Sequence, residues 1–238
     1  MLMIVRLNWL MYAKAAALAA FGWLVSTQLE GPSKWAAIAA AALPVFWTAS
    51  SLAASWWIYD RARIYELGWL HRTPGKWLTL HNGLDGITGT LRSLYPSLEG
   101  QTLDIFDPYE MTEPSILEVR RQMNQSTDHQ TNWRYLPGAN QSYDTVFLVF
   151  TAHELRRWES RQRLFLEIQR VLKDDGRIVL VEHLRDWNNF AAFGPGAFHF
   201  YSKRAWLAST APAGLELLED RRITPFVHAL EFGKLCVR

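Results

Sequence analysis

Two histidines follow apolar runs that have the character of buried strands. His153 and Glu154 come shortly after the run 144–150, and Glu182 with His183 closes a second run. An imidazole titrates near neutral pH, so either histidine could accept a proton from a reacting group. A structural interpretation stands beside this chemical one: His153 with Glu154 could cap the following helix, and His183 could be a satisfied histidine at a strand end.

A sheet is needed to bring these side chains together. From Trp77 onward, short apolar runs alternate with helical patterns, which predicts an α/β domain with a parallel sheet and crossover helices. The runs cover residues 77–80, 102–107, 144–150 and 177–183, and residues 215–218 and 230–237 could supply two last strands. Ligands of open α/β sheets bind beyond the carboxyl ends of the strands. Thr151, His153 and Glu182 are therefore expected beside one crevice.

Charge is divided unevenly along the 238 residues, whose mean hydropathy is −0.09. The first 59 residues carry four charged side chains: Arg6, Lys14, Glu30 and Lys34. The rest carries 22 Lys/Arg against 22 Asp/Glu, so the formal net charge of +2 comes from the first part. A nucleic-acid binder is disfavoured, because neutralising phosphates needs a basic face. The single cysteine, Cys236, cannot form an internal disulfide and fits a reducing compartment.

The first part of the chain, residues 1–62, is predicted to form a transmembrane helical hairpin. Residues 35–59 form a run of 25 with no charge and 20 apolar side chains. At about 1.5 Å per residue this run exceeds the roughly 30 Å of bilayer hydrocarbon. A weaker span covers about residues 10–29. The competing interpretations are a long buried core helix and a signal peptide, but no small-x-small cleavage site follows Val25.

Basic residues on either side of the hairpin predict its orientation. Those before it are Arg6 and Lys14, and those after it are Arg61, Arg63 and Arg72. By the positive-inside tendency, both termini and the domain over residues 63–238 lie in the cytoplasm. The protein is thus expected to be a multi-pass membrane protein with two spans.

Three segments of the larger part resemble the class I S-adenosylmethionine-dependent methyltransferases. Residues 136–146 are similar to the loop that leads into the family's fourth strand, and residues 214–227 to its closing segment. Residues 170–180, which contain Leu-Lys-Asp-Asp-Gly-Arg-Ile-Val-Leu, look like its helix, turn and fifth strand. The resemblance spans about residues 70–238. It implies a Rossmann-like, mostly parallel sheet of seven strands, S-adenosylmethionine as the cofactor and methyl transfer as the activity.

The resemblance also implies a cofactor loop after the first strand, although the sequence departs from the family's Gly-x-Gly-x-Gly pattern. With Gly83 as the middle glycine, His81 and Asp85 stand where the outer glycines would be. Glycine matters there because the backbone must approach the cofactor closely. His81, Gly83, Asp85 and Gly86 are the candidate residues, with Asp85 in a position to compensate for the missing family acid.

A carboxylate at the end of the second strand holds the ribose hydroxyls in the family that this chain resembles. Asp107 and Asp104 are the two candidates, and Asp107 is preferred because it closes the run 102–107. Val119 and Arg120 look like the family's Ala-Arg pair farther along the chain. Thr151 completes the candidate cofactor-binding set.

These features predict a membrane-anchored methyltransferase that acts on a lipophilic small molecule such as a quinone, an isoprenoid or a lipid headgroup. His153, His183 and Glu182 are the candidate catalytic residues, and no spacing has the form of a metal-binding signature. The aromatic segment 188–200 could roof an apolar substrate pocket. Two alternatives stay open: another reaction of the same cofactor, such as quinone amination, and a catalytically degenerate, membrane-bound interaction module.

Overall fold

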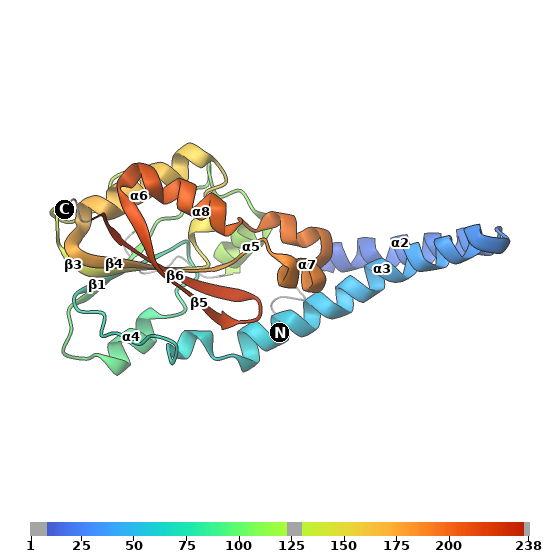
Figure 1. Ribbon diagram of the computed structural model, residues 1–238, viewed down its shortest axis with the longest axis horizontal. Coiled ribbons are helices and arrows are strands. Elements are labelled where there is room, and N and C mark those ends of the chain that lie inside the picture. The colour runs from blue at the N-terminus through green and yellow to red at the C-terminus, as the bar shows by residue number, and fades with distance from the viewer. Residues whose placement is uncertain (1–8, 123–129, 236–238) are drawn as a thin grey trace. The chain divides into compact units, whose positions relative to one another are not determined.

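The computed structural model describes residues 9–122 and 130–235, so Arg6 and Cys236 lie outside the described part. Its internal contacts divide the chain into two compact units (Figure 1). The first unit comprises Met1–Ala62 and Asp186–His199, and the second comprises Arg63–Arg185 and Phe200–Arg238. The predicted boundary at residue 62 did not anticipate that Asp186–His199 groups with the N-terminal part.

Two helices form a hairpin in the first unit. Helix α2 (Trp9–Ser26) packs against α3 (Gly31–Trp56), which continues into the π-helical turn η1 (Trp57–Arg61). A Cβ atom on Gly22 would lie only 2.9 Å from the Cβ of Ala41. The close approach of the two helices therefore depends on small residues, as it does in helix pairs within membranes.

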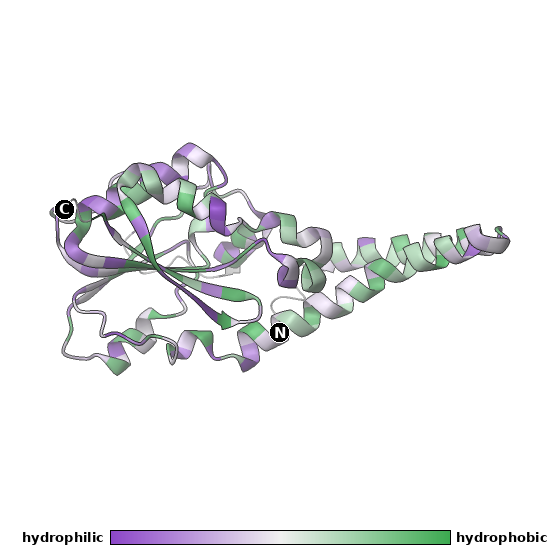
Figure 2. Cartoon of the chain, in the orientation of Figure 1, coloured by the Kyte–Doolittle hydropathy of each residue, from purple (hydrophilic) through white to green (hydrophobic). Residues whose placement is uncertain are grey.

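The hairpin exposes its apolar side chains. Hydrophobic residues run along both helices (Figure 2). In the most apolar 18-residue stretch of each, only 6% and 11% of the residues are buried. The large exposed side chains include Leu18, Phe21, Trp23, Leu24, Trp35 and Phe46. A core helix of a soluble protein would be mostly buried, so that interpretation does not fit these helices. Both are long and apolar enough to cross a bilayer.

Helix α7 (Trp187–Phe193) and the 3₁₀ turn η4 (Gly194–His199) belong to the same unit as the hairpin. Helix α7 packs on α3, and the rings of Phe190 and Trp47 meet edge to face with centroids 6.1 Å apart. A Cβ atom on Gly194 would overlap the Trp47 ring. The segment predicted as the roof of a substrate pocket is thus built against the second hairpin helix.

The second unit is built on a sheet of six strands in the order β2-β1-β3-β4-β6-β5. The strands are β1 (Trp77–His81), β2 (Gly100–Asp104), β3 (Tyr143–Val149), β4 (Leu172–His183), β5 (Leu215–Thr224) and β6 (Val227–Lys234). The first four are parallel, and β6 runs antiparallel to both β4 and β5. Seven strands were predicted, and the described residues form six. At the outer edge of β2, Gln130 makes a single parallel bridge with Asp104.

Helices cover both faces of this sheet. Figure 1 shows α6 (Trp158–Val171) and α8 (Lys203–Thr210) on one face and α4 (Thr88–Leu94) on the other, and α5 (Pro114–Gln122) follows β2 in the chain. The side chains of β1 are buried throughout, as expected of an inner strand of a parallel sheet. The core contains the fully buried rings of Trp77, Phe147, Phe165, Trp206 and Phe232.

Strands β2, β4, β5 and β6 begin or end several residues away from the predicted positions. Strand β2 begins at Gly100 and ends at Asp104, whereas the prediction placed its end at Asp107. Beyond this strand end the Asp104 carboxylate accepts a hydrogen bond from the Phe106 amide at 3.0 Å. Strand β4 begins at Leu172, so the predicted turn over residues 174–176 lies within an irregular stretch of the strand.

We predict that Gly100→Ala destabilises the second unit. A Cβ atom at this position would overlap the buried indole of Trp77 on the neighbouring strand, and overpacking of a core costs about 1–3 kcal/mol. The thermal unfolding midpoint of the full chain in detergent, followed by circular dichroism, should fall. Gly89→Ala in α4 is the control, because a Cβ atom there would have no heavy atom within 4 Å. This variant should stabilise the second unit by about 0.5–1 kcal/mol, since glycine is unfavourable in a helix. Equal midpoints for the two variants would contradict the packing described here.

Candidate active site

The carboxyl ends of the four parallel strands carry most of the predicted site residues. His81 ends β1 and pairs in register with Asp104, which ends β2. Thr151 and His153 follow β3, and His183 ends β4. The sheet thus brings the candidates together at one edge, in two groups that follow the β1/β2 pair and the β3/β4 pair.

The loop after β1 contains a buried amide that sequence analysis missed. Asn82 is 1% exposed, and in the described part of the chain neither atom of its side-chain amide has a hydrogen-bond partner. Its neighbour Gly83 has φ +109°, a conformation that favours glycine, and the Gly83 amide donates to Nδ1 of His81 at 3.0 Å. A buried polar group without a partner is costly, so Asn82 marks a position where a ligand could bind. Its place within the glycine-bearing segment was the signal that could have identified it.

Asp85 and Gly86 serve the local structure of this loop. The Asp85 carboxylate accepts hydrogen bonds from the Ile87 and Thr88 amides at 3.2 and 3.0 Å, and from the Thr102 hydroxyl at 3.2 Å. These donors hold both oxygens at the start of α4 and give Asp85 a structural role in the loop. A Cβ atom on Gly86 would overlap the ring of Tyr65, whose burial raises its pKa to about 12.

The strand-end acid is Asp104, and not Asp107 as preferred from the sequence. Asp104 is 1% exposed and accepts from Arg120 Nη1 at 2.7 Å. Asp107 lies three residues beyond β2, where its Oδ2 accepts from Trp133 Nε1 and Arg134 Nη1, both at 2.9 Å. Partial burial opposes ionisation of Asp107, but hydrogen bonds from Trp133, the Tyr109 amide and Arg134 lower its pKa overall. Asp107 thus fastens the loop that follows β2.

Arg120 on α5 joins the two loops of this edge. Its Nη1 atom also donates to the Asn82 carbonyl at 3.1 Å, and the guanidinium lies 4.1 Å from the centroid of the Phe106 ring. A Cβ atom on Gly83 would lie 2.7 Å from the same Nη1 atom. One side chain therefore covers both the glycine and the strand-end carboxylate.

His153 is held between two buried glutamates after β3. Its Nδ1 atom lies 2.8 Å from Glu182 Oε2, and its Nε2 atom lies 3.3 Å from Glu154 Oε1. Burial would lower the pKa of His153, but the charges and hydrogen bonds of Glu182 and Glu154 outweigh it and raise the pKa to about 10. A protonated imidazole cannot accept a proton, so this environment disfavours the predicted role of His153 as a base near neutral pH. Neither His153 nor Glu154 caps α6, whose N-cap residue is Arg157.

His183 is the second candidate base, and its ring is held by stacking. It lies between Phe150 and Phe200, with centroid distances of 5.2 and 4.7 Å. Its Nδ1 atom is 3.0 Å from the Phe226 carbonyl oxygen. Because a carbonyl only accepts, Nδ1 carries the hydrogen, and the acceptor of the neutral ring is Nε2.

Thr151 is fully buried and donates its hydroxyl to the Val149 carbonyl at 3.0 Å, which gives it a role in the turn.

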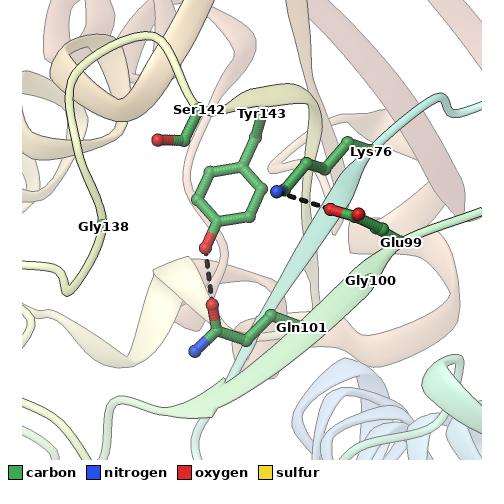
Figure 3. A pocket seen from close by; sticks show the side chains of 7 residues that line it. All are labelled: Lys76, Glu99, Gly100, Gln101, Gly138, Ser142 and Tyr143. Atoms are coloured by element: carbon green, nitrogen blue, oxygen red, sulfur yellow. Dashed lines mark hydrogen bonds and ion pairs between the residues drawn. The ribbon is translucent and has the colours of Figure 1, made fainter.

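A cavity of about 570 Å³ lies elsewhere, at the amino ends of β1, β2 and β3 (Figure 3). It is lined by Lys76, Glu99, Gly100, Gln101, Gly138, Ser142 and Tyr143. Lys76 Nζ pairs with Glu99 at 2.6 Å, and the Tyr143 hydroxyl donates to Gln101 Oε1 at 2.6 Å. None of the predicted site residues lines this cavity, which lies at the opposite edge of the sheet from them.

The chain is similar to methyltransferases, in sequence over residues 110–180 and in fold over most of its length. Residues 110–180 match a family model described as a methyltransferase domain, and no curated protein matches the chain. Similar solved structures include a Pyrococcus horikoshii protein with a TM-score of 0.53 and 15% identity, over 74% of this chain and 91% of that one. An O-methyltransferase family 2 protein of Planctomyces limnophilus, solved with apigenin, has a TM-score of 0.54 and 14% identity, over 85% and 69%. A SAM-dependent methyltransferase of Aquifex aeolicus has a TM-score of 0.50 and 13% identity, over 78% and 95%.

We predict that His153 stays protonated well above neutral pH in the folded protein. Since its folded pKa of about 10 exceeds the ordinary histidine value of 6.5, protonation stabilises the fold fully below about pH 6.5. That contribution is lost as the pH rises toward about 10. The measurement is an NMR titration of the full chain with isotope-labelled histidine, in which His153→Gln identifies the resonance. A His153 signal that titrates near pH 6.5 would rule out the arrangement with the two glutamates.

Proposed function

We propose that this chain is a membrane-anchored S-adenosylmethionine-dependent methyltransferase acting on a lipophilic small molecule, because residues 110–180 match a methyltransferase-domain model and the fold is similar to that of solved methyltransferases. The observation that carries the proposal is the edge formed by the ends of β1 and β2. There Gly83 adopts a positive φ, Asn82 holds a buried amide with no described partner, and Asp104 ends the strand. When bound, S-adenosylmethionine supplies an activated methyl group on a sulfonium centre.

The groups of this edge fit such a cofactor. The Asn82 amide offers both a donor and an acceptor, and the missing side chain of Gly83 allows close approach to the backbone. A carboxylate has about four acceptor positions, so Asp104 can accept from ribose hydroxyls beside its bond from the Phe106 amide. Arg120 covers both Gly83 and Asp104, and its side chain must move aside when the cofactor enters.

The β3/β4 group supplies charge and a proton acceptor at the same edge. Two carboxylates, Glu182 and Glu154, surround one imidazolium, His153, and an excess of negative charge favours a cationic ligand such as a sulfonium. His183 remains the candidate base for an acceptor that must lose a proton, since its neutral ring accepts at Nε2. Methyl transfer otherwise requires mainly the alignment of the two reactants.

The hairpin supports the membrane part of the proposal. Both helices expose nearly all of their most apolar stretches. Exposing this apolar surface to water would cost free energy, whereas a bilayer would stabilise it. An anchored enzyme meets a lipid-soluble substrate within the same membrane, which is why we assign a lipophilic acceptor. The basic residues after the hairpin support a cytoplasmic location for the catalytic domain and both termini.

One observation favours a second candidate function, a membrane-bound interaction module without catalysis. The cation on Arg120 already satisfies Asp104 and fills the space beside Gly83. A carboxylate that is already paired with its own arginine does not need a cofactor for stability. Cofactor binding distinguishes the two functions.

We predict that Asp104→Asn weakens cofactor binding by the full chain in detergent. A hydrogen bond to a charged group contributes about 1.5–3 kcal/mol, so the Kd for S-adenosylhomocysteine, read by calorimetry, should rise about 10- to 150-fold. Asp107→Asn is the matched control, because its carboxylate faces Trp133 and Arg134, and its Kd should change little. If the wild type binds and Asp107→Asn abolishes this binding while Asp104→Asn does not, the cofactor-binding carboxylate is Asp107 and not Asp104. The absence of binding by the wild type would instead favour the interaction module.

We predict that the hairpin crosses the membrane with its loop outside. In a Cys236→Ser background, Gln28→Cys in the loop should react with an impermeant maleimide on intact bacterial cells that express the full chain. Tyr109→Cys, which is 92% exposed in the second unit, should react only after lysis. Labelling of Tyr109→Cys on intact cells would reverse the topology, and release of the protein from membranes by alkaline carbonate would exclude the anchor.

A further inference from the structure

The first unit contains a second apolar surface besides the hairpin. We propose that the interfacial segment, defined as Trp187–His199, lies in the bilayer at the boundary between headgroups and acyl chains, beside α3. This inference rests on the proposed membrane anchor and adds a lipid contact from a distant part of the chain. The partner to which it commits is the lipid bilayer that holds the hairpin.

The side chains of the interfacial segment fit this environment. The sequence from Trp187 to Phe200 contains no Asp, Glu, Lys or Arg. Trp187 is 85% exposed and Phe198 is 64% exposed, so two large aromatic side chains face outward from a short helix and turn. Aromatic rings with this exposure favour the membrane interface, where apolar area is buried and a polar edge stays hydrated.

Packing holds these rings against the hairpin. The Phe190 ring contacts Trp187 and Phe198, with centroids 6.1 and 6.0 Å apart, and meets Trp47 of α3 at 6.1 Å. Gly194 brings the backbone of η4 close against the same Trp47 ring. The exposed rings are therefore continuous with the apolar surface of α3, and a bilayer that surrounds the hairpin also reaches them.

The contact point on α3 sets the depth of the segment. Trp47 precedes the end of α3 at Trp56 by nine residues, or about 13 Å along the helix axis. Trp56 and Trp57 are exposed aromatic residues that suit the headgroup level. Headgroup layers are about 5–7 Å thick, so Trp47 and the segment packed on it lie several ångströms below the hydrocarbon boundary. Interfacial helices insert to this depth.

The polar donors of Asn189 at the start of the segment are satisfied within the protein. The Asp186 carboxylate accepts from the Asn189 backbone amide at 2.9 Å and from its side-chain amide at 3.2 Å. Satisfying these donors internally lowers the cost of moving the start of α7 out of water. Only three residues separate His183 from Trp187 in the sequence, so the chain leads directly from the end of β4 to this lipid contact.

Lipid quenching tests the inference on the full chain in phosphatidylcholine vesicles. An environment-sensitive fluorophore is attached to Trp187→Cys, or separately to Phe198→Cys, in a Cys236→Ser background. Spin labels placed near the top of the acyl chains should quench both positions strongly, and labels deep in the acyl chains should quench them less. Since both side chains are exposed, replacing them should leave folding unchanged. Tyr109→Cys in the second unit is the matched exposed control and should not be quenched.

A third position, Phe21→Cys on the exposed side of α2, separates this inference from the proposed anchor. Quenching at Phe21→Cys together with none at positions 187 and 198 would overturn the interfacial segment and leave the anchor intact. No quenching at any of the three positions would overturn the anchor itself. Quenching at Tyr109→Cys equal to that at position 187 would show nonspecific adsorption and would also count against the proposal.

Discussion

Parallel pairing of β1, β2, β3 and β4 is the constraint on which the candidate active site depends. Parallel strands end at the same edge of a sheet, so residues far apart in the sequence, such as His81 and His183, end strands at one edge. The buried runs are mostly apolar, with few polar side chains such as Thr79 and Thr145 inside the strands. The polar groups therefore gather immediately beyond the strand ends, where loops can orient them.

Buried charges at that edge occur in contact with opposite charges, and this pairing connects stability with function. A carboxylate buried without a cation is strongly destabilising, so Asp104 needs Arg120, and Glu182 needs His153. Each partner also changes the chemistry of the site. Arg120 covers the glycine loop, and the glutamates keep His153 protonated. Arrangements that stabilise the fold thus decide which groups are available for a cofactor or a proton.

The first unit differs from the second, because much of its apolar surface is exposed and not buried in a core. The hairpin packs through small residues such as Gly22 and Ala41, and presents large side chains outward. Segment Trp187–His199 joins this unit through Phe190 and Trp47, although it follows the last parallel strand in the sequence. In the proposed function, both features serve one purpose, which is to keep a catalytic domain at the membrane where a lipophilic substrate is found.

Local patterns in the sequence determined the two apolar helices, the alternation of strands and helices, and the edge at which the candidate residues gather, since periodicity and length depend on neighbouring residues alone. Tertiary structure decided the details. The apolar residues Ile105 and Phe106 extend the second run in the sequence, yet pairing ends at Asp104, and the preference for Asp107 was wrong about the strand end. The contacts of Arg120 with Asp104 and of Glu182 with His153 join residues 16 and 29 positions apart. Such contacts depend on how elements pack in space, and no local pattern encodes that packing.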